Sequence, residues 1–193
     1  MNTFPKVSVV TTTYNDIENL KRILAEVKKQ TYPNIEHIIV DGGSTDGTVD
    51  LLKELEEKEP GRISWMSEKD NGIYDAINKG IRMATGEIVG CCFDRYADEG
   101  VLMRMVEIME KEGTDGVHGD LCYMDGDRIV RKWHQGQGVI RSGWMPGHPT
   151  LQWCSQCSPN PVCRMVVGRC SSSGCSYPHC IRQKERMERW KAG

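Results

Sequence analysis

Acids, hydroxyls and glycines are concentrated in four short segments of the chain, and each segment directly follows a run of apolar and β-branched residues. The segments are residues 13–15, 41–44 and 68–72, together with Asp94. Carboxylates and hydroxyls bind polar ligands through hydrogen bonds, and glycine lets the backbone approach a ligand closely. These residue types predict a ligand site, provided that the four segments meet in the folded chain.

The elements that would bring these segments together alternate in type. Apolar residues at helical spacing predict helices, with Asn15 or Asp16 as a cap of the first helix and Ser44 or Thr45 as a cap of the second. Strands are predicted between the helices at residues 7–12, 35–40, 63–66 and 87–93. This alternation predicts an α/β fold with a mostly parallel sheet. Such sheets bind ligands beyond the carboxyl ends of their strands, where the four polar segments fall.

The composition excludes several classes of protein. The chain has 193 residues, of which 38% are hydrophobic and 27% charged, so it can bury a core and is not disordered throughout. A formal net charge of −2 argues against a nucleic-acid binder. No run of about 18 apolar residues predicts a membrane span, and the N-terminus lacks the pattern of a signal peptide. We therefore expect a cytoplasmic protein.

The composition changes abruptly near Leu151. Residues 1–151 contain three cysteines and carry a net charge of −7, whereas residues 152–193 contain six cysteines and carry +5. We expect two parts: a ligand-binding domain over residues 1–151, and an irregular, Cys-rich basic tail over residues 152–193 that is poorly ordered or aberrant.

The first part resembles family 2 glycosyltransferases. Each motif alone is weak, but several follow one another in the order of the family over roughly the first three quarters of the chain. They lie at residues 9–15, 30–36, 40–48, 70–80 with 85–88, and 143–146 with 148–151. The resemblance implies a GT-A fold, which is a Rossmann-like, mostly parallel sheet flanked by helices. It also implies a nucleotide-diphosphate sugar donor, a divalent metal (Mg²⁺ or Mn²⁺), and a nucleotide-sugar-binding domain whose acceptor half is incomplete.

The resemblance implies roles for individual residues. It places the Asp41 carboxylate on the base of the donor, as a charge-assisted acceptor. It places Asp70 near the ribose or the sugar, although the favourable position of an acid at a helix N-terminus explains Asp70 equally well. Asp94 is the implied catalytic and metal-binding carboxylate. The implied donor-binding residues are Thr13, Tyr14, Asn15, Asp41, Asp70, Gly72 and Asn78.

Two departures from the family pattern bear on activity. Arg95 stands beside Asp94, and a guanidinium competes for the oxygens that a divalent cation needs. No segment after Leu151 matches the helix that carries the general base in the family, and we interpret His148 as structural. We therefore expect weak turnover or none.

Three hypotheses of function stay open. The first is a glycosyltransferase, acting on an unknown glycan or lipid-linked acceptor in surface polysaccharide synthesis, in the cytoplasm or at the inner face of the membrane. The second is a degraded relative that binds nucleotide. The third is a zinc-binding interaction module on a nucleotide-binding fold.

The tail also has three interpretations. Cys154 and Cys157 form a C-x₂-C pair followed by further Cys and His residues, as in zinc sites. Disulfides are the second interpretation, which a cytoplasmic setting disfavours. The third, which we favour, is translation in a shifted reading frame, because the tail is rich in Cys, Ser, Arg and Pro and has almost no apolar periodicity. A one-base shift in the encoding DNA should then restore family-like sequence.

Overall fold

The computed structural model describes residues 4–114, 116–125, 128–133, 139–140 and 166–169. In chain order its elements are β1 (Val7–Thr13), α1 (Ile17–Lys29), β2 (Ile35–Asp41), α2 (Thr48–Lys58), β3 (Ile63–Ser67), α3 (Ile73–Met83), β4 (Ile88–Cys91), α4 (Val101–Glu112), β5 (Gly116–His118), β6 (Leu121–Asp125), β7 (Arg128–Trp133), β8 (Val139–Ile140) and β9 (Val166–Arg169).

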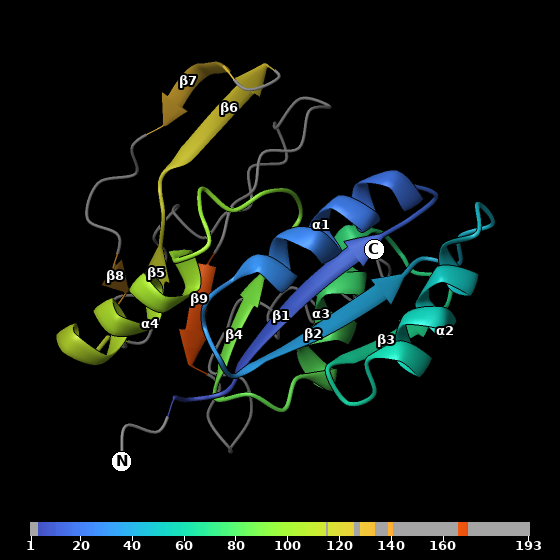
Figure 1. Cartoon of the computed structure of the whole chain (residues 1–193), viewed down its shortest axis with the longest axis horizontal. Helices are drawn as coiled ribbons and strands as arrows, with labels where there is room; N and C mark the ends of the chain where they lie inside the picture. The colour runs from blue at the N-terminus through green and yellow to red at the C-terminus, as the bar shows by residue number, and fades with distance from the viewer. Residues whose placement is uncertain (1–3, 115, 126–127, 134–138, 141–165, 170–193) are drawn as a thin grey trace, which may run out of the picture.

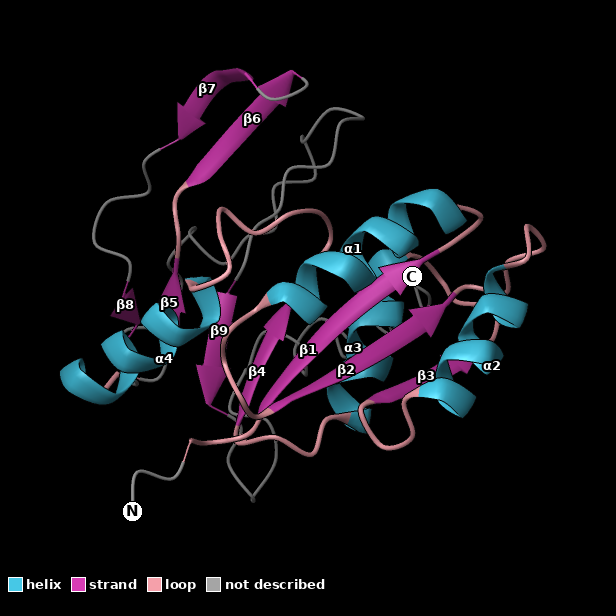
Figure 2. Cartoon of the chain, viewed as in Figure 1, coloured by secondary structure: helices cyan, strands magenta, loops and turns pink. Residues whose placement is uncertain are grey.

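A central sheet with strand order β3-β2-β1-β4-β9-β5-β8 organises the described residues (Figure 1). The first four strands in this order are parallel, with Val7 of β1 opposite Ile35 of β2 and Ile88 of β4. The last three strands are antiparallel to their neighbours, and β6 and β7 form a separate hairpin (Figure 2). The predicted α/β fold with a mostly parallel sheet is confirmed.

Helices cover both faces of this sheet. Side chains of α1 and α4 pack with β1 and β4 around Val9 and Ile23, and side chains of α1 and α2 pack with β2 and β3 around Ile39. Helix α3 covers the opposite face, where its Ile81 packs against a cluster of Val10 and neighbouring buried residues. Figure 1 shows α1 and α2 in front of the sheet and α3 behind it. Helices α1, α2 and α3 each connect two parallel strands. The carboxyl ends of β1, β2 and β3 therefore lie at the same edge of the sheet.

Two local predictions about helix ends had different outcomes. Of the two predicted caps of α1, Asn15 and Asp16, the cap is Asp16, whose Oδ1 accepts a hydrogen bond from the backbone of Asn19 (3.3 Å). The prediction that Ser44 or Thr45 caps α2 is wrong, since the cap position is Gly47 in the left-handed conformation (φ 92°). Ser44 and Thr45 instead bond to groups at the ends of β1 and β2.

Strand β9 lies within the segment that we predicted to be an irregular tail. It occupies residues 166–169 and pairs with both β4 and β5 in the central sheet. The cysteines of the tail that were considered as zinc ligands, His148 and the motif at residues 143–151 lie outside the described residues. The division of the chain at Leu151 stays a prediction.

The close packing of α3 on the sheet gives the first testable prediction. A Cβ on Gly80 would lie 2.4 Å from Val10 Cγ1 and 3.3 Å from Val40 Cγ2, and both valines are fully buried. We expect Gly80→Ala to lower the free energy of unfolding by about 1–3 kcal/mol, measured by urea denaturation, because overpacking shifts a rigid core. Gly119→Ala is the control, since nothing lies within 4 Å of its added Cβ. Equal midpoints for the two variants would contradict the prediction.

Candidate functional site

The loops that follow β1 and β2 are tied together at the carboxyl edge of the sheet. Thr13 ends β1 opposite Asp41, and its carbonyl accepts a hydrogen bond from the backbone of Gly42 (2.9 Å). Asn15 adopts a left-handed conformation (φ 49°), and its Oδ1 accepts from the backbone of Thr45 (2.8 Å). The Asn15 side chain is thus engaged within the protein and holds the loop after β2.

Asp41 is fully buried at the end of β2, and its carboxylate organises the same loop. Its Oδ2 accepts hydrogen bonds from the backbone of Gly43 (3.2 Å) and Ser44 (2.9 Å) and from Ser67 Oγ (2.6 Å). Ser44 Oγ donates to Oδ1. A carboxylate oxygen has two acceptor positions, so Oδ1 keeps one for a further donor.

The side chains of Tyr14 and Asp70 meet over Gly42. A Cβ on Gly42 would lie 2.9 Å from Asp70 Oδ2 and 3.1 Å from Tyr14 Cδ2, so the two side chains flank the bare backbone there. Tyr14 is 65% exposed, whereas Asp70 is half-buried. The other carboxylate oxygen of Asp70, Oδ1, accepts a hydrogen bond from the backbone of Gly72 (2.8 Å), which has a φ of 105°. An exposed aromatic ring, a carboxylate and a glycine therefore share one place at the rim.

Helix α3 begins beside this place and carries two further polar side chains. Asn78 is half-buried on this helix. Lys79 was not predicted as a site residue, although it lies within a quoted motif. Its ammonium group contacts Glu68 Oε1 (2.7 Å) and Asp75 Oδ2 (3.5 Å) and donates to the carbonyl of Lys69 (3.2 Å). The hydrogen bond with Glu68 raises the pKa of Lys79, so this lysine is a fixed positive charge that holds the loop before α3.

Asp94 follows β4, on the other side of β1 from β2. Its carboxyl group is half-buried, and burial raises its pKa above the ordinary value. Arg95 and Arg22 act in the opposite direction. No hydrogen bond or ion pair within the described residues joins Asp94 to Tyr14 or Asp70. The structure thus groups Tyr14 with Asp70 and places Asp94 beside the guanidinium groups.

The described part of the chain contains no group of three or more His, Cys, Asp or Glu side chains that could hold a metal ion. Asp94 supplies a single carboxylate, and the positive charges of Arg95 and Arg22 act on it against a further cation. The protein side chains described here therefore do not by themselves fit the divalent metal that the resemblance implies.

A chain of buried hydrogen bonds links β2, β1 and the end of β4, and sequence reasoning missed it. His37 Nε2 lies 2.8 Å from Thr11 Oγ1, and the Thr11 hydroxyl donates to the carbonyl of Cys92 (3.0 Å). Because the threonine proton is used on Cys92, His37 Nε2 must be the donor in its own bond. Burial lowers the pKa of His37 to about 4, and Arg62 contributes in the same direction, so the ring is neutral at pH 7.

A comparison with known proteins identifies the family of the chain. The sequence model of the family described as "Glycosyl transferase family 2" matches residues 8–169. The chain belongs to glycosyl transferase family 2. The family match continues past Leu151 and ends at the last residue of β9.

Relatives within the family include an uncharacterised glycosyltransferase of Mycobacterium tuberculosis. It is 40% identical over 116 residues, which are 58% of this chain and 43% of the relative. A PGL/p-HBAD biosynthesis glycosyltransferase of Mycobacterium bovis is 32% identical over 120 residues, 61% of this chain and 47% of that protein. The chain thus covers less than half the length of either relative.

Solved structures of similar fold include a mannosyltransferase of Pyrobaculum calidifontis in complex with GDP-Man and Mn²⁺. Its TM-score is 0.54 at 26% identity, covering 64% of this chain and 37% of that one. Residues 1–349 of TarS from Staphylococcus aureus give a TM-score of 0.53 at 25% identity, covering 65% and 38%. These likenesses confirm the predicted GT-A fold. No helix in the described part of the chain is long and apolar enough to cross a membrane.

Proposed function

We propose that this chain binds a nucleotide-diphosphate sugar at the rim formed by Tyr14, Gly42 and Asp70. As a glycosyltransferase, it would then transfer the sugar to a glycan or a lipid-linked acceptor. The observation that carries the proposal is the meeting of the Tyr14 ring and the Asp70 carboxylate over Gly42, within 3.1 Å and 2.9 Å of an added Cβ. This place lies beyond the carboxyl ends of parallel strands, where open α/β sheets bind ligands.

Each group at the rim suits one part of the donor. The exposed ring of Tyr14 offers a flat surface on which a base can stack. The free acceptor positions of Asp70 Oδ2 suit ribose or sugar hydroxyls, because a carboxylate accepts strong hydrogen bonds. Asp41 is fully buried, and its carboxylate supports the site by holding the loop of Gly43 and Ser44. Thr13, Asn15, Gly72 and Asn78 belong to the proposed site chiefly because they shape the loops and helix around it.

A divalent metal stays a proposal that rests on the relatives. The mannosyltransferase of similar fold was solved with GDP-Man and Mn²⁺. In this chain the described side chains do not form a metal site on their own, so we assign no step of the reaction to Mg²⁺ or Mn²⁺. Titrations with and without Mn²⁺ show whether nucleotide binding depends on it.

Calorimetric titration of the chain with UDP, GDP and their sugar conjugates tests the proposal. We expect saturable binding of one nucleotide, and we expect Gly42→Ala to weaken it about tenfold by pushing apart the Tyr14 ring and the Asp70 carboxylate. Gly42 does not have a positive φ, so alanine fits the backbone. Gly119→Ala, with open space around its Cβ, should bind like the unchanged chain. No binding by the unchanged chain, or equal binding by both variants, would contradict the proposal.

The name of one relative bears on the acceptor. The relative from Mycobacterium bovis is named for PGL/p-HBAD biosynthesis, which supports a role in making surface polysaccharides or glycolipids. Such a role would place the protein in the cytoplasm or at the inner face of a membrane. The alternative function is a degraded relative that binds nucleotide without transferring sugar. The positive charges of Arg95 and Arg22, which act on Asp94, favour this alternative.

A further inference from the structure

A small pocket lies between α1 and α2, on the face of the sheet that these two helices cover, near the amino end of β2. Its volume is about 120 Å³, and Leu24, Leu55 and Ile63 form much of its apolar wall. It contains none of the residues of the proposed donor site, since those lie beyond the carboxyl ends of the strands. An apolar cavity of about 150 Å³ is known to bind benzene, so a pocket of this size suits one small ring.

His37 gives this pocket a polar group. The side chain is 3% exposed and lines the pocket from β2. Its Nε2 donates to Thr11, which leaves Nδ1 as a bare acceptor in the neutral ring. No hydrogen bond to Nδ1 is present among the residues that the structure describes. Nδ1 is not among the fully buried polar atoms that lack a partner, so it is accessible, and a ligand that donates a hydrogen bond can take the place of water there.

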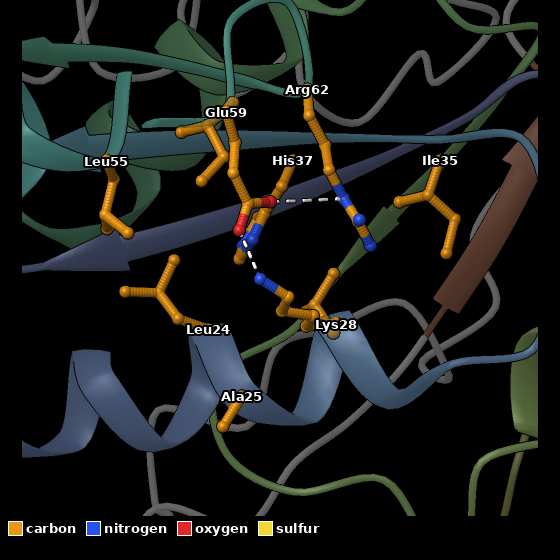
Figure 3. Close-up of a pocket in the computed structure, with 10 residues that line it drawn as sticks. Leu24, Ala25, Lys28, Ile35, His37, Leu55, Glu59 and Arg62 are labelled. Carbon is orange, nitrogen blue, oxygen red and sulfur yellow. Dashed lines mark hydrogen bonds and ion pairs between the residues drawn. The ribbon is translucent and has the colours of Figure 1, made fainter. Parts of the chain in front are cut away.

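The mouth of the pocket carries charged groups that select the ligand further. Figure 3 shows Glu59 between Lys28 and Arg62, and dashed lines join it to both. The contact of Glu59 Oε2 with Arg62 Nε is loose, at 3.8 Å. Two cations against one carboxylate leave a net positive charge at the mouth, which disfavours a cationic ligand. Arg62 also lowers the pKa of His37, which keeps Nδ1 an acceptor at neutral pH.

We infer that this pocket is a second binding site, for a small neutral ligand with an apolar ring and one hydroxyl group that donates to His37 Nδ1. Phenol is the simplest molecule with these features, and toluene is its counterpart of similar shape without the donor. The inference does not depend on the donor site, so it stands or fails separately from the proposed glycosyltransferase function.

Methyl and imidazole NMR of the full 193-residue chain tests the inference. We expect phenol to shift the methyl signals of Leu24, Leu55 and Ile63 saturably, and toluene to bind about fivefold more weakly because it lacks one hydrogen bond. The ¹⁵N signal of His37 Nδ1 should move with phenol and stay in place with toluene. Absence of saturable shifts with phenol, or equal affinity for toluene, would overturn the inference.

A variant that blocks the pocket provides a second check. Ala25 lines the pocket from an exposed position on α1, so Ala25→Trp should cover the mouth without disturbing the core. We expect this variant to lose phenol binding at least about tenfold. Glu18→Trp adds the same indole to α1 at an exposed position outside the pocket and should bind phenol normally. Normal binding by Ala25→Trp would show that phenol binds elsewhere and would refute the site.

Discussion

Glu36→Gln is expected to lower the free energy of unfolding by about 3 kcal/mol at neutral pH. The Glu36 side chain is 9% exposed and forms an ion pair with Lys6 Nζ (2.6 Å). It accepts hydrogen bonds from the backbone of Thr85 (2.6 Å) and Gly86 (3.2 Å) and from the hydroxyls of Ser8 and Thr85. Glutamine has one acceptor oxygen and an NH₂ group, so it cannot satisfy all of these donors.

The pH dependence identifies the carboxylate as the cause. Burial opposes ionisation of Glu36, but the hydrogen bonds from Lys6, Ser8 and Thr85 outweigh it and lower the pKa from 4.5 to about 2. A carboxyl whose pKa is lower in the folded state contributes stability above its unfolded pKa and loses it as the pH falls through the folded value. The difference between the two proteins should therefore be full at pH 7, shrink below about pH 4.5, and be nearly gone near pH 2.

Urea denaturation from pH 7 to about pH 2 measures this difference. His37 also destabilises the fold as the pH falls from 6.5 to about 4, but it is present in both proteins and cancels in the comparison. Glu54→Gln is the control, because Glu54 pairs with Lys58 on the exposed surface of α2, where water screens the interaction. Its unfolding midpoint should match that of the unchanged chain. A loss for Glu36→Gln that stays the same at every pH would contradict the assignment to ionisation.

Local patterns predicted the parallel half of the sheet correctly because each piece of it is encoded by a short stretch of chain. The β-branched run at the start of the chain, the Asp16 cap and the polar residues at strand ends all act over a few residues. Once the strands are parallel, their carboxyl ends must meet, and Tyr14 and Asp70 come together over Gly42 as a consequence. The shared rim was therefore predictable in outline.

Features that depend on the register between strands were not predictable in the same way. Glu36 and His37 are adjacent, and both are buried, on opposite faces of β2. Their partners lie on β1: Ser8 is directly opposite Glu36, whereas Thr11 is opposite Ile39, two residues along the strand from His37. Both contacts form only in the register that the sheet adopts. Strand β9 pairs with β4 across a separation of more than seventy residues in the chain. Periodicity in a single sequence carries no information on pairings of this kind.

Asp94→Asn is expected to reduce the release of diphosphate from a nucleotide sugar by about a hundredfold or more, if the proposed donor site turns over. Asp94 follows β4 at the same edge of the sheet as the proposed donor site, and Arg95 and Arg22 carry positive charge close to it. Asp94 has the catalytic role in this proposal, and burial raises the pKa of its carboxyl group, as is common at active sites. Asparagine keeps the size of the side chain but removes the charge.

Asp98→Asn is the matched control for this experiment. It makes the same chemical change four residues later, at an exposed carboxylate that accepts from the backbone of Gly100 (2.8 Å) and from Arg104 (2.7 Å) just before α4. We expect it to release diphosphate at the rate of the unchanged chain. Both variants should bind nucleotide with similar affinity in the titration described above, so that a loss in Asp94→Asn alone is a loss in the chemical step.

The outcomes separate the two functions under consideration. A working transferase requires diphosphate release that depends on Asp94 and not on Asp98. If all three proteins bind nucleotide but none releases diphosphate, the degraded relative is favoured, because the site then binds the donor without cleaving it. Equal release by Asp94→Asn and the unchanged chain would contradict the catalytic role of Asp94, and the acid that acts on the donor would have to be sought among the residues around Asp70.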